Sequence, residues 1–250
     1  MKKKITAIFL CVALVAIAIV GASLAYFTDT DTATNTFTVG GVKINLIEQQ
    51  RGEDGLVPFE QNKILMPIVG SAQGAKDEYD MPVAKNYVDK IITVQNTGAS
   101  EAYVRVFVAV PANLQNGQTP NAPSEDILHF NWNKASSADG QWTDEIVVDG
   151  STTIDGVVYR IYSRTYKTAL KANEITASPA YIGFYLDKGV DIDSDGNYTV
   201  KFGNKPAEVI NFDFSKGVSV PVFAQAVQAD GFTDYADAFA KAGLPSNPWA

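Results

Sequence analysis

The pattern of hydrophobic and polar residues divides the chain into a short apolar segment and a long alternating one. Residues 5–20 form an uncharged apolar run, which Lys2, Lys3 and Lys4 precede. After residue 36, apolar side chains recur at every second position in short stretches that Gly, Pro, Asn and Asp separate. A period of two is typical of β-strands with one buried face. The pattern therefore predicts an apolar leader followed by an all-β domain.

The most apolar strand is predicted at residues 102–110, where Val104, Val106, Val108 and Val110 share one face. Because burial of each valine is worth roughly 1.5–3 kcal/mol, we expect this strand at the centre of a sheet. Residues 49–62 are polar and are predicted to form a loop. By the same alternation, further strands are predicted at residues 36–47, 63–69, 88–95, 145–148, 152–154, 157–162, 181–186, 198–202, 209–214 and 218–228.

A short helix is predicted near the C-terminus. Thr233 can cap residues 234–242, and Gly243 follows them. About ten short strands without alternating helices predict an antiparallel two-sheet β-sandwich. The expected division is a signal peptide at residues 1–25, an N-terminal strand region at residues 26–48, a β-sandwich at residues 49–231, and a short helix with a tail at residues 232–250.

Composition and charge exclude several classes of function. The only cysteine, Cys11, lies in the apolar run, so a cleaved chain would have no disulfide, thiol nucleophile or thiolate metal site. Removal of the leader would also remove three lysines, leaving 17 basic and 28 acidic residues and a net charge of −11. Nucleic-acid binding requires a basic footprint, so we expect no nucleic-acid partner for this acidic chain.

The leader has the three parts of a secretory signal peptide: a basic start, an apolar run and small residues at its end. With Ser23 and Ala25 as the small pair, the predicted cut falls between Ala25 and Tyr26. The alternative is an uncleaved membrane anchor, because residues 5–27 could span a bilayer as a helix. A small-residue site follows the apolar run and no basic stop-transfer cluster does, which favours cleavage. Membrane contact is expected only through an uncleaved leader.

Two short motifs after the apolar run carry a resemblance to a known family. The letters AYFTD at residues 25–29 and NTFTVG at residues 35–40 resemble the TasA/camelysin family of exported Gram-positive proteins. The segment at residues 222–231, which contains the end of the last predicted strand, is similar to the closing strand of TasA-type domains. This resemblance implies a jelly roll, export through a dedicated signal peptidase, and a role as a biofilm-matrix fibre subunit, with an accessory matrix protein as a possible partner.

The resemblance and the physics of sheet edges together suggest how a fibre would form. A strand that becomes free after cleavage can add to an exposed sheet edge of a second copy. Tyr26, Phe27, Phe37 and Val39 are the apolar residues of this candidate assembly strand. Such an insertion is head-to-tail and gives an open homopolymer. The alternative is that residues 36–39 pair within their own domain and residues 26–35 form a disordered tail.

A candidate calcium loop lies between two predicted strands. Asp191, Asp193, Asp195 and Asn197 alternate around Ile192, Ser194 and Gly196, which is how loops present oxygen ligands to a hard cation. An EF-hand needs a bidentate Glu at its twelfth position, and Phe202 occupies that position here. The sequence leaves two readings, a weak extracellular calcium site and a solvated hairpin turn that Asp and Gly favour in any case. No other cofactor is expected.

Catalysis is not expected. His129 is the only histidine, so neither a His-rich zinc site nor a Ser-His-Asp triad has its usual residues. A metalloendopeptidase is implied only by the resemblance to camelysin. The remaining alternative is a monomeric cell-surface module, which would bind a glycan on an aromatic platform or act through the calcium loop. The platform residues would be Trp132, Trp142, Tyr159, Tyr162 and Tyr166. Aromatic residues of this kind more often pack in the core or between sheets, and that reading is favoured for them.

Overall fold

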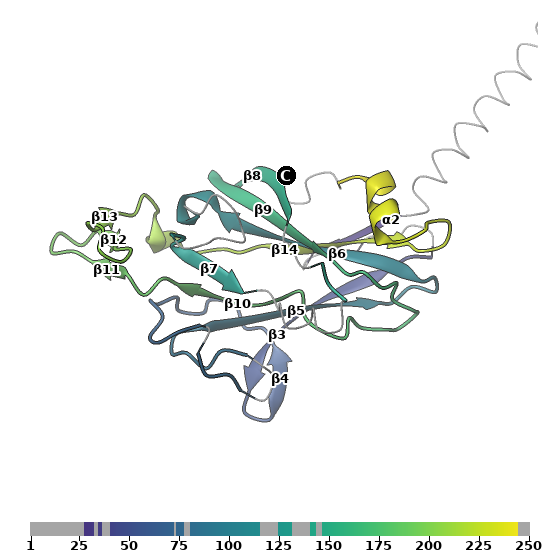
Figure 1. Ribbon diagram of the computed structural model, residues 1–250, viewed down its shortest axis with the longest axis horizontal. Coiled ribbons are helices and arrows are strands. Elements are labelled where there is room, and N and C mark those ends of the chain that lie inside the picture. Colours follow the sequence, from purple (N-terminus) through teal and green to yellow (C-terminus); the bar gives the residue numbers. More distant parts are fainter. Residues whose placement is uncertain are drawn as a thin grey trace, which may run out of the picture.

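The protein is a mostly β structure with two large antiparallel sheets packed face to face and a small third sheet (Figure 1). This predicted class, an antiparallel all-β fold resembling a sandwich, is confirmed. The computed structural model describes residues 28–32, 35–36, 41–72, 74–77, 81–115, 125–131, 141–143 and 147–244.

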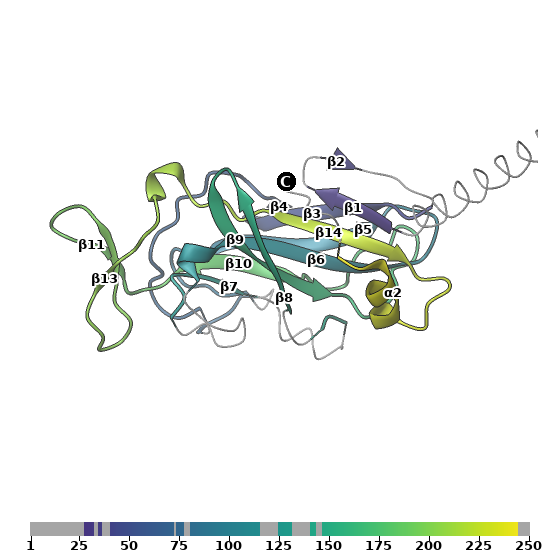
Figure 2. The same ribbon diagram turned by 90° about the horizontal axis from the view of Figure 1, so that it is seen from above.

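The first sheet has six strands in the order β2-β1-β14-β6-β9-β8, and Figure 2 shows it from above. Every neighbouring pair in it is antiparallel. Its strands are β1 (Thr28–Thr32), β2 (Asn35–Thr36), β6 (Ala102–Pro111), β8 (Val147–Ile154), β9 (Val157–Thr165) and β14 (Val222–Gln228).

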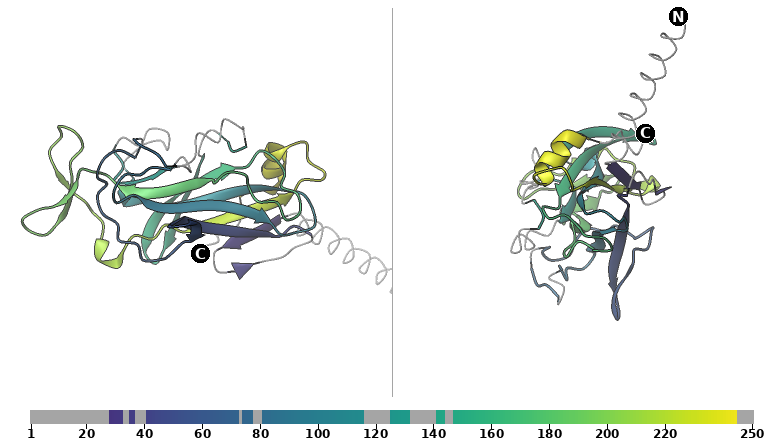
Figure 3. Two further views of the ribbon diagram at one scale, coloured as in Figure 1. Left: turned by 90° about the horizontal axis from the view of Figure 1, so that it is seen from below. Right: turned by 90° about the vertical axis from the view of Figure 1, so that its right-hand side faces the viewer.

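The second sheet has five strands in the order β4-β3-β5-β10-β7 and forms the other layer (Figure 3, left). Its strands are β3 (Ile44–Gly52), β4 (Gly55–Pro58), β5 (Val88–Asn96), β7 (Leu128–Asn131) and β10 (Tyr181–Leu186). A small sheet of β11 (Val190–Ile192), β12 (Tyr198–Val200) and β13 (Glu208–Val209) projects from one end of the molecule (Figure 2).

The main core lies between the two large sheets. The four alternating valines of β6, from Val104 to Val110, are completely buried in it. β6 lies between β14 and β9, so the predicted central position of this strand is confirmed. Ala224 and Ala226 of β14 join the same core, where small side chains let the layers approach closely.

A short helix covers the outer face of the six-stranded sheet (Figure 1). This helix, α2 (Tyr235–Ala242), packs Ala238 and Phe239 against Val227 of β14. The predicted helix is confirmed, but its cap is Asp234 rather than Thr233, because the Asp234 side chain accepts a hydrogen bond from the amide of Asp237.

Several predicted boundaries were wrong. Residues 49–62 contain the β3–β4 hairpin instead of only a loop, whereas residues 63–69 contain isolated bridges at Pro67 and Val69 instead of a strand. The two predicted strands at residues 145–148 and 152–154 are one strand, β8, with an irregular register between Val148 and Gly150. A bulge of this kind inserts one residue without ending the strand. The extra residue interrupts the alternation of apolar and polar positions, and the pattern therefore predicted two strands.

Candidate functional site

The first described strand closes one side of the six-stranded sheet. β1 pairs antiparallel with β14, with Thr28 opposite Val227 and Thr32 opposite Phe223. β14 in turn pairs with β6, so both of its edges are hydrogen-bonded. Six of the seven β14 residues are buried, which makes β14 an interior strand that needs a partner on each side. We take this edge of β14 as the candidate functional site.

The outer edge of β1 is covered only briefly. β2 pairs two residues with it, Asn35 opposite Thr32 and Thr36 opposite Asp31. The predicted alternative of a disordered tail is therefore wrong for residues 28–32, which form a strand within their own chain. The polar sequence Thr-Asp-Thr-Asp-Thr gave no alternation signal for this strand, since its pairing is made by backbone groups.

The predicted cleavage and assembly residues lie outside the described residues. These are Ser23, Ala25, Tyr26, Phe27, Phe37 and Val39. β1 begins two residues after the predicted new N-terminus at Tyr26, so the described strand and the predicted assembly strand are parts of one segment.

The aspartate-rich loop between β11 and β12 forms a tight turn. Oδ1 of Asp193 accepts hydrogen bonds from the amides of Asp195 and Asn197, at 2.9 and 2.8 Å, and Oδ2 accepts from the Asn197 side-chain amide. These bonds, those from Asn197 first, lower the pKa of Asp193. Asp191 bonds the amide of Ile192. The carboxylates thus support the turn itself, and among the described residues no group of three or more His, Cys, Asp or Glu side chains is placed to hold a metal ion. Calcium binding stays a prediction.

His129 lies on β7 and faces Asp187. Its Nε2 is 3.1 Å from Oδ2 of Asp187, and its ring stacks on Tyr185 with centroids 4.7 Å apart. Burial raises the pKa of the Asp187 carboxyl, but hydrogen bonds from His129 and from the Gly189 amide outweigh it and leave the pKa below its ordinary value. Burial also raises the pKa of Tyr185 to about 12. No serine or cysteine nucleophile is hydrogen-bonded to His129 in the described part of the chain.

The alternative of an aromatic sugar-binding platform is wrong for its four described residues, and core packing, which was weighed against it, is confirmed for them. Trp142, Tyr159, Tyr162 and Tyr166 are all buried, with exposed fractions of 0%, 5%, 1% and 3%. Trp142 packs edge-on against Tyr166, and its indole N–H donates to the carbonyl of Ser178. Large aromatic side chains with satisfied polar atoms belong to the core, and they cannot present a face to a sugar. Trp132, the fifth residue of the platform, lies outside the described residues.

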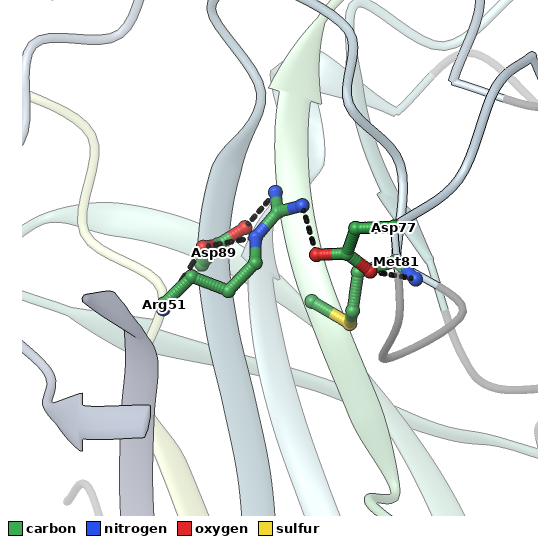
Figure 4. Close-up of polar contacts among 4 residues, drawn as sticks. All are labelled: Arg51, Asp77, Met81 and Asp89. Atoms are coloured by element: carbon green, nitrogen blue, oxygen red, sulfur yellow. Dashed lines mark hydrogen bonds and ion pairs between the residues drawn. The ribbon is translucent and has the colours of Figure 1, made fainter. Parts of the chain in front are cut away.

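One polar cluster was not found from the sequence. The side chain of Arg51, on β3, donates two hydrogen bonds to Asp89 of β5, at 2.6 and 2.8 Å, and one to Asp77 at 2.9 Å (Figure 4). The Arg51 backbone amide donates a third bond to Asp89, at 3.1 Å. Asp77 also accepts from the amide of Met81. The bonds to Asp89, and then that to Asp77, keep the pKa of Arg51 above its ordinary value. The cluster holds the segment that precedes β5 against the outer face of the five-stranded sheet. Its hydrogen bonds join residues of this chain to one another.

Comparison with known proteins assigns no family to this chain. Family models, curated proteins and solved structures were each searched, and none matches the chain. Within the described residues no helix is long and apolar enough to cross a membrane. The fold and the site therefore define the class, an antiparallel β-protein with a helix on one sheet and an N-terminal strand that completes a buried edge.

Proposed function

We propose that this chain is a secreted structural subunit of an extracellular fibre, such as the biofilm matrix of a Gram-positive bacterium, and that copies join by exchanging β1. The observation that carries the proposal is the pairing of β1, the first described strand, with the buried strand β14. The resemblance of residues 25–40 to the TasA/camelysin family supports the same function. A jelly-roll connectivity, a helical leader and a dedicated signal peptidase belong to this proposal as well.

The physical argument concerns the edge that β1 covers. Removal of β1 leaves the backbone groups of β14 unpaired along residues that are buried on both faces, and such an edge readily accepts another strand. The β1 segment of a second copy has the same sequence and fits the same register. Because a subunit that gives β1 to one neighbour receives β1 from another, the contact is head-to-tail and gives an open filament.

In this proposal, cleavage during export determines when strand exchange can begin. Before cleavage the leader is joined directly to the segment that contains β1, and after the cut between Ala25 and Tyr26 that segment has a free end. Strand exchange requires a free end or a long linker, since the strand must leave one sheet and enter another. The cleavage therefore controls when a subunit can donate β1.

A disulfide between β1 and β14 tests the proposal, because the cleaved chain has no cysteine of its own. Asp29 and Ala226 are directly opposite in the register, so the double variant Asp29→Cys/Ala226→Cys can lock β1 within its own chain. The oxidised variant should stay monomeric in size-exclusion chromatography and form no filaments in electron microscopy. The reduced variant is its matched control and should assemble like the unmodified protein.

Three outcomes would count against the proposal. Filaments formed by the oxidised variant, with the disulfide verified by mass spectrometry, would show that assembly does not need release of β1. Filaments formed by a chain that lacks residues 26–35 would show that the N-terminal segment is not the assembly strand. Absence of filaments under every condition for the cleaved protein would contradict the fibre function itself.

A further inference from the structure

The segment just before β3 is held by the turn that joins β5 to β6. Two carbonyl groups of this segment, those of Gly41 and Lys43, each accept two hydrogen bonds from amides of the turn. The donors are Thr97 and Gly98 for Lys43, at 2.7 and 2.9 Å, and Ala99 and Ser100 for Gly41, at 3.1 and 3.3 Å. Val42 lies between the two acceptors and is completely buried in the main core. We call residues 41–43 and 97–100 together the clamp.

Asn96 fixes the shape of the turn. It is completely buried. Its Oδ1 accepts a hydrogen bond from the amide of Gly98 at 2.9 Å, and its Nδ2 donates to the carbonyls of Ser100 and Leu170 at 2.8 and 2.9 Å. A buried amide side chain with both ends satisfied favours one conformation of the backbone around it. The turn is therefore tied both to β5 and to the segment after β9.

Gly98 lets the two parts of the clamp approach closely. A Cβ atom at this position would be 2.4 Å from the carbonyl oxygen of Gly41 and 2.6 Å from the amide nitrogen of Lys43. Both neighbours are backbone atoms, which cannot rotate away as the end of a side chain can. Glycine permits such an approach between two backbones. The clamp thus depends on the absence of a side chain at residue 98.

The clamp stands where the chain passes from one large sheet to the other. β1 belongs to the six-stranded sheet and β3 to the five-stranded sheet. Eight residues, 33–40, join the end of β1 at Thr32 to Gly41. Because an extended chain rises by at most about 3.3–3.6 Å per residue, this connection reaches about 30 Å. The end of β1 therefore stays within that distance of the clamp wherever the strand docks.

We propose that the clamp is the fixed hinge of strand exchange: β1 and β2 pass to a neighbouring copy, and the chain from Gly41 onward stays in its own subunit. The inference rests on the proposed fibre function. Among the described strands β2 pairs only with β1, so the two move together. Detachment of β1 breaks its ladder with β14. Opening of the clamp would break four further hydrogen bonds and bring Val42 out of the core, so the clamp stays closed.

The consequence for the fibre is a regular spacing. Each subunit begins its connection at the same fixed point, and the β14 edge that receives β1 must be reached from that point within about 30 Å. A short connection that starts from a rigid turn leaves neighbouring subunits little freedom to move apart. The expected assembly is a filament of closely spaced subunits instead of a string of loosely linked domains.

Two disulfides, one on each side of the hinge, test the inference. Lys43 and Thr97 lie one position beyond Ile44 and Asn96, the last pair of the β3–β5 ladder, so Lys43→Cys/Thr97→Cys can close the clamp covalently. The oxidised clamp variant should form the same amount of filament as its reduced form in electron microscopy. The β1–β14 lock described above is its matched counterpart and should stop assembly. Mass spectrometry verifies each disulfide.

Hydrogen exchange on the cleaved, unassembled protein tests the clamp without filaments. The amides of β1 should exchange at least about tenfold faster than those of Ala99 and Ser100, after correction for intrinsic rates, because β1 opens locally and the clamp does not. Gly98→Ala should speed exchange at Ala99 and Ser100 by about tenfold or more, since the new Cβ pushes the clamp apart. Ser100→Ala, in the same turn, leaves the Gly98 contact intact and should keep the protection.

The outcomes separate the hinge from the proposed function. Loss of filaments in the oxidised clamp variant alone would overturn the hinge and leave strand exchange standing, because the chain would then have to open beyond Gly41. Equal exchange rates for β1 and the clamp would overturn it as well, and this measurement decides the question even where the cysteine variant does not fold. Absence of filaments from the unmodified cleaved protein would overturn the fibre function and the hinge together.

Discussion

The ring of Tyr87 lies directly against Gly183 of β10. A Cβ atom at Gly183 would be 2.5 Å from Cε1 of Tyr87 and 2.5 Å from the carbonyl oxygen of Val88. The register between β10 and β5 shifts at this point, between Tyr181 and Gly183. Glycine is required here because it lets the ring and the neighbouring backbone approach without a side chain between them.

Gly183→Ala should therefore lower the free energy of unfolding by about 1–3 kcal/mol through overpacking. Urea denaturation at neutral pH measures the change. The double variant Gly183→Ala/Tyr87→Ala should lose less than the sum of the two single variants, because removal of the ring relieves half of the clash. Strict additivity would show that Tyr87 does not restrict this site.

Arg51 should matter more for the segment before β5 than for the whole sandwich. Its side chain is 21% exposed, and its charged hydrogen bonds to Asp77 and Asp89 are worth about 1–3 kcal/mol after allowance for solvent screening. We expect Arg51→Met to speed tryptic cleavage after Lys76 and Lys85. Lys63→Met, which breaks the more exposed pair with Glu60, is the control. Equal cleavage rates for the two variants would contradict the role of Arg51.

Asp187 should stabilise the fold only where it is ionised. Its pKa is lowered in the folded protein, so its contribution is present above the unfolded value of about 3.9 and is lost as the pH falls through the folded pKa. Asp187→Asn should be less stable than the unmodified protein at pH 7, and the gap should narrow below about pH 4. Urea denaturation from pH 7 to pH 2.5 measures this gap, with Asp54→Asn as an exposed control. A gap that stays constant would exclude the linkage.

Asp193 should hold the β11–β12 turn independently of any cation. Asp193→Ala removes the acceptor of the Asp195 and Asn197 amides, and both amides should exchange faster with deuterium in calcium-free buffer. Unchanged exchange would show that the turn does not depend on the carboxylate. Calcium titration by calorimetry then tests the predicted site separately: heat that disappears in Asp193→Ala supports it, and no heat with the unmodified protein removes it.

The sequence predicted best the elements whose two faces differ chemically. β6 was placed correctly because its valines recur at every second position and mark one face of the strand for burial. β3 extends well past the predicted end at residue 47, since its last residues, Gln49 to Gly52, are polar and are held by backbone pairing with β4. Backbone pairing leaves no trace in a hydrophobic pattern, and the β3–β4 hairpin was missed for this reason.

The candidate site depended on contacts that no local pattern contains. β1 is polar, and its partner β14 lies almost two hundred residues further along the chain. Arg51 forms hydrogen bonds with Asp77 and Asp89, which lie 26 and 38 residues further along the chain. The aromatic platform failed in the opposite way, because Trp142 and the tyrosines have composition typical of both a core and a binding surface, and only the packing distinguishes these alternatives.

The unequal ladders on the two sides of β14 also define the mechanical order of the molecule. β1 is joined to β14 over five positions and β14 to β6 over seven. A pulling force applied through the N-terminal segment reaches the five-position ladder first, and the strands between β14 and β8 carry it only afterwards. The molecule should thus yield under tension by detaching one short polar strand, while the valine-rich layer behind it keeps its shape and can take the strand back.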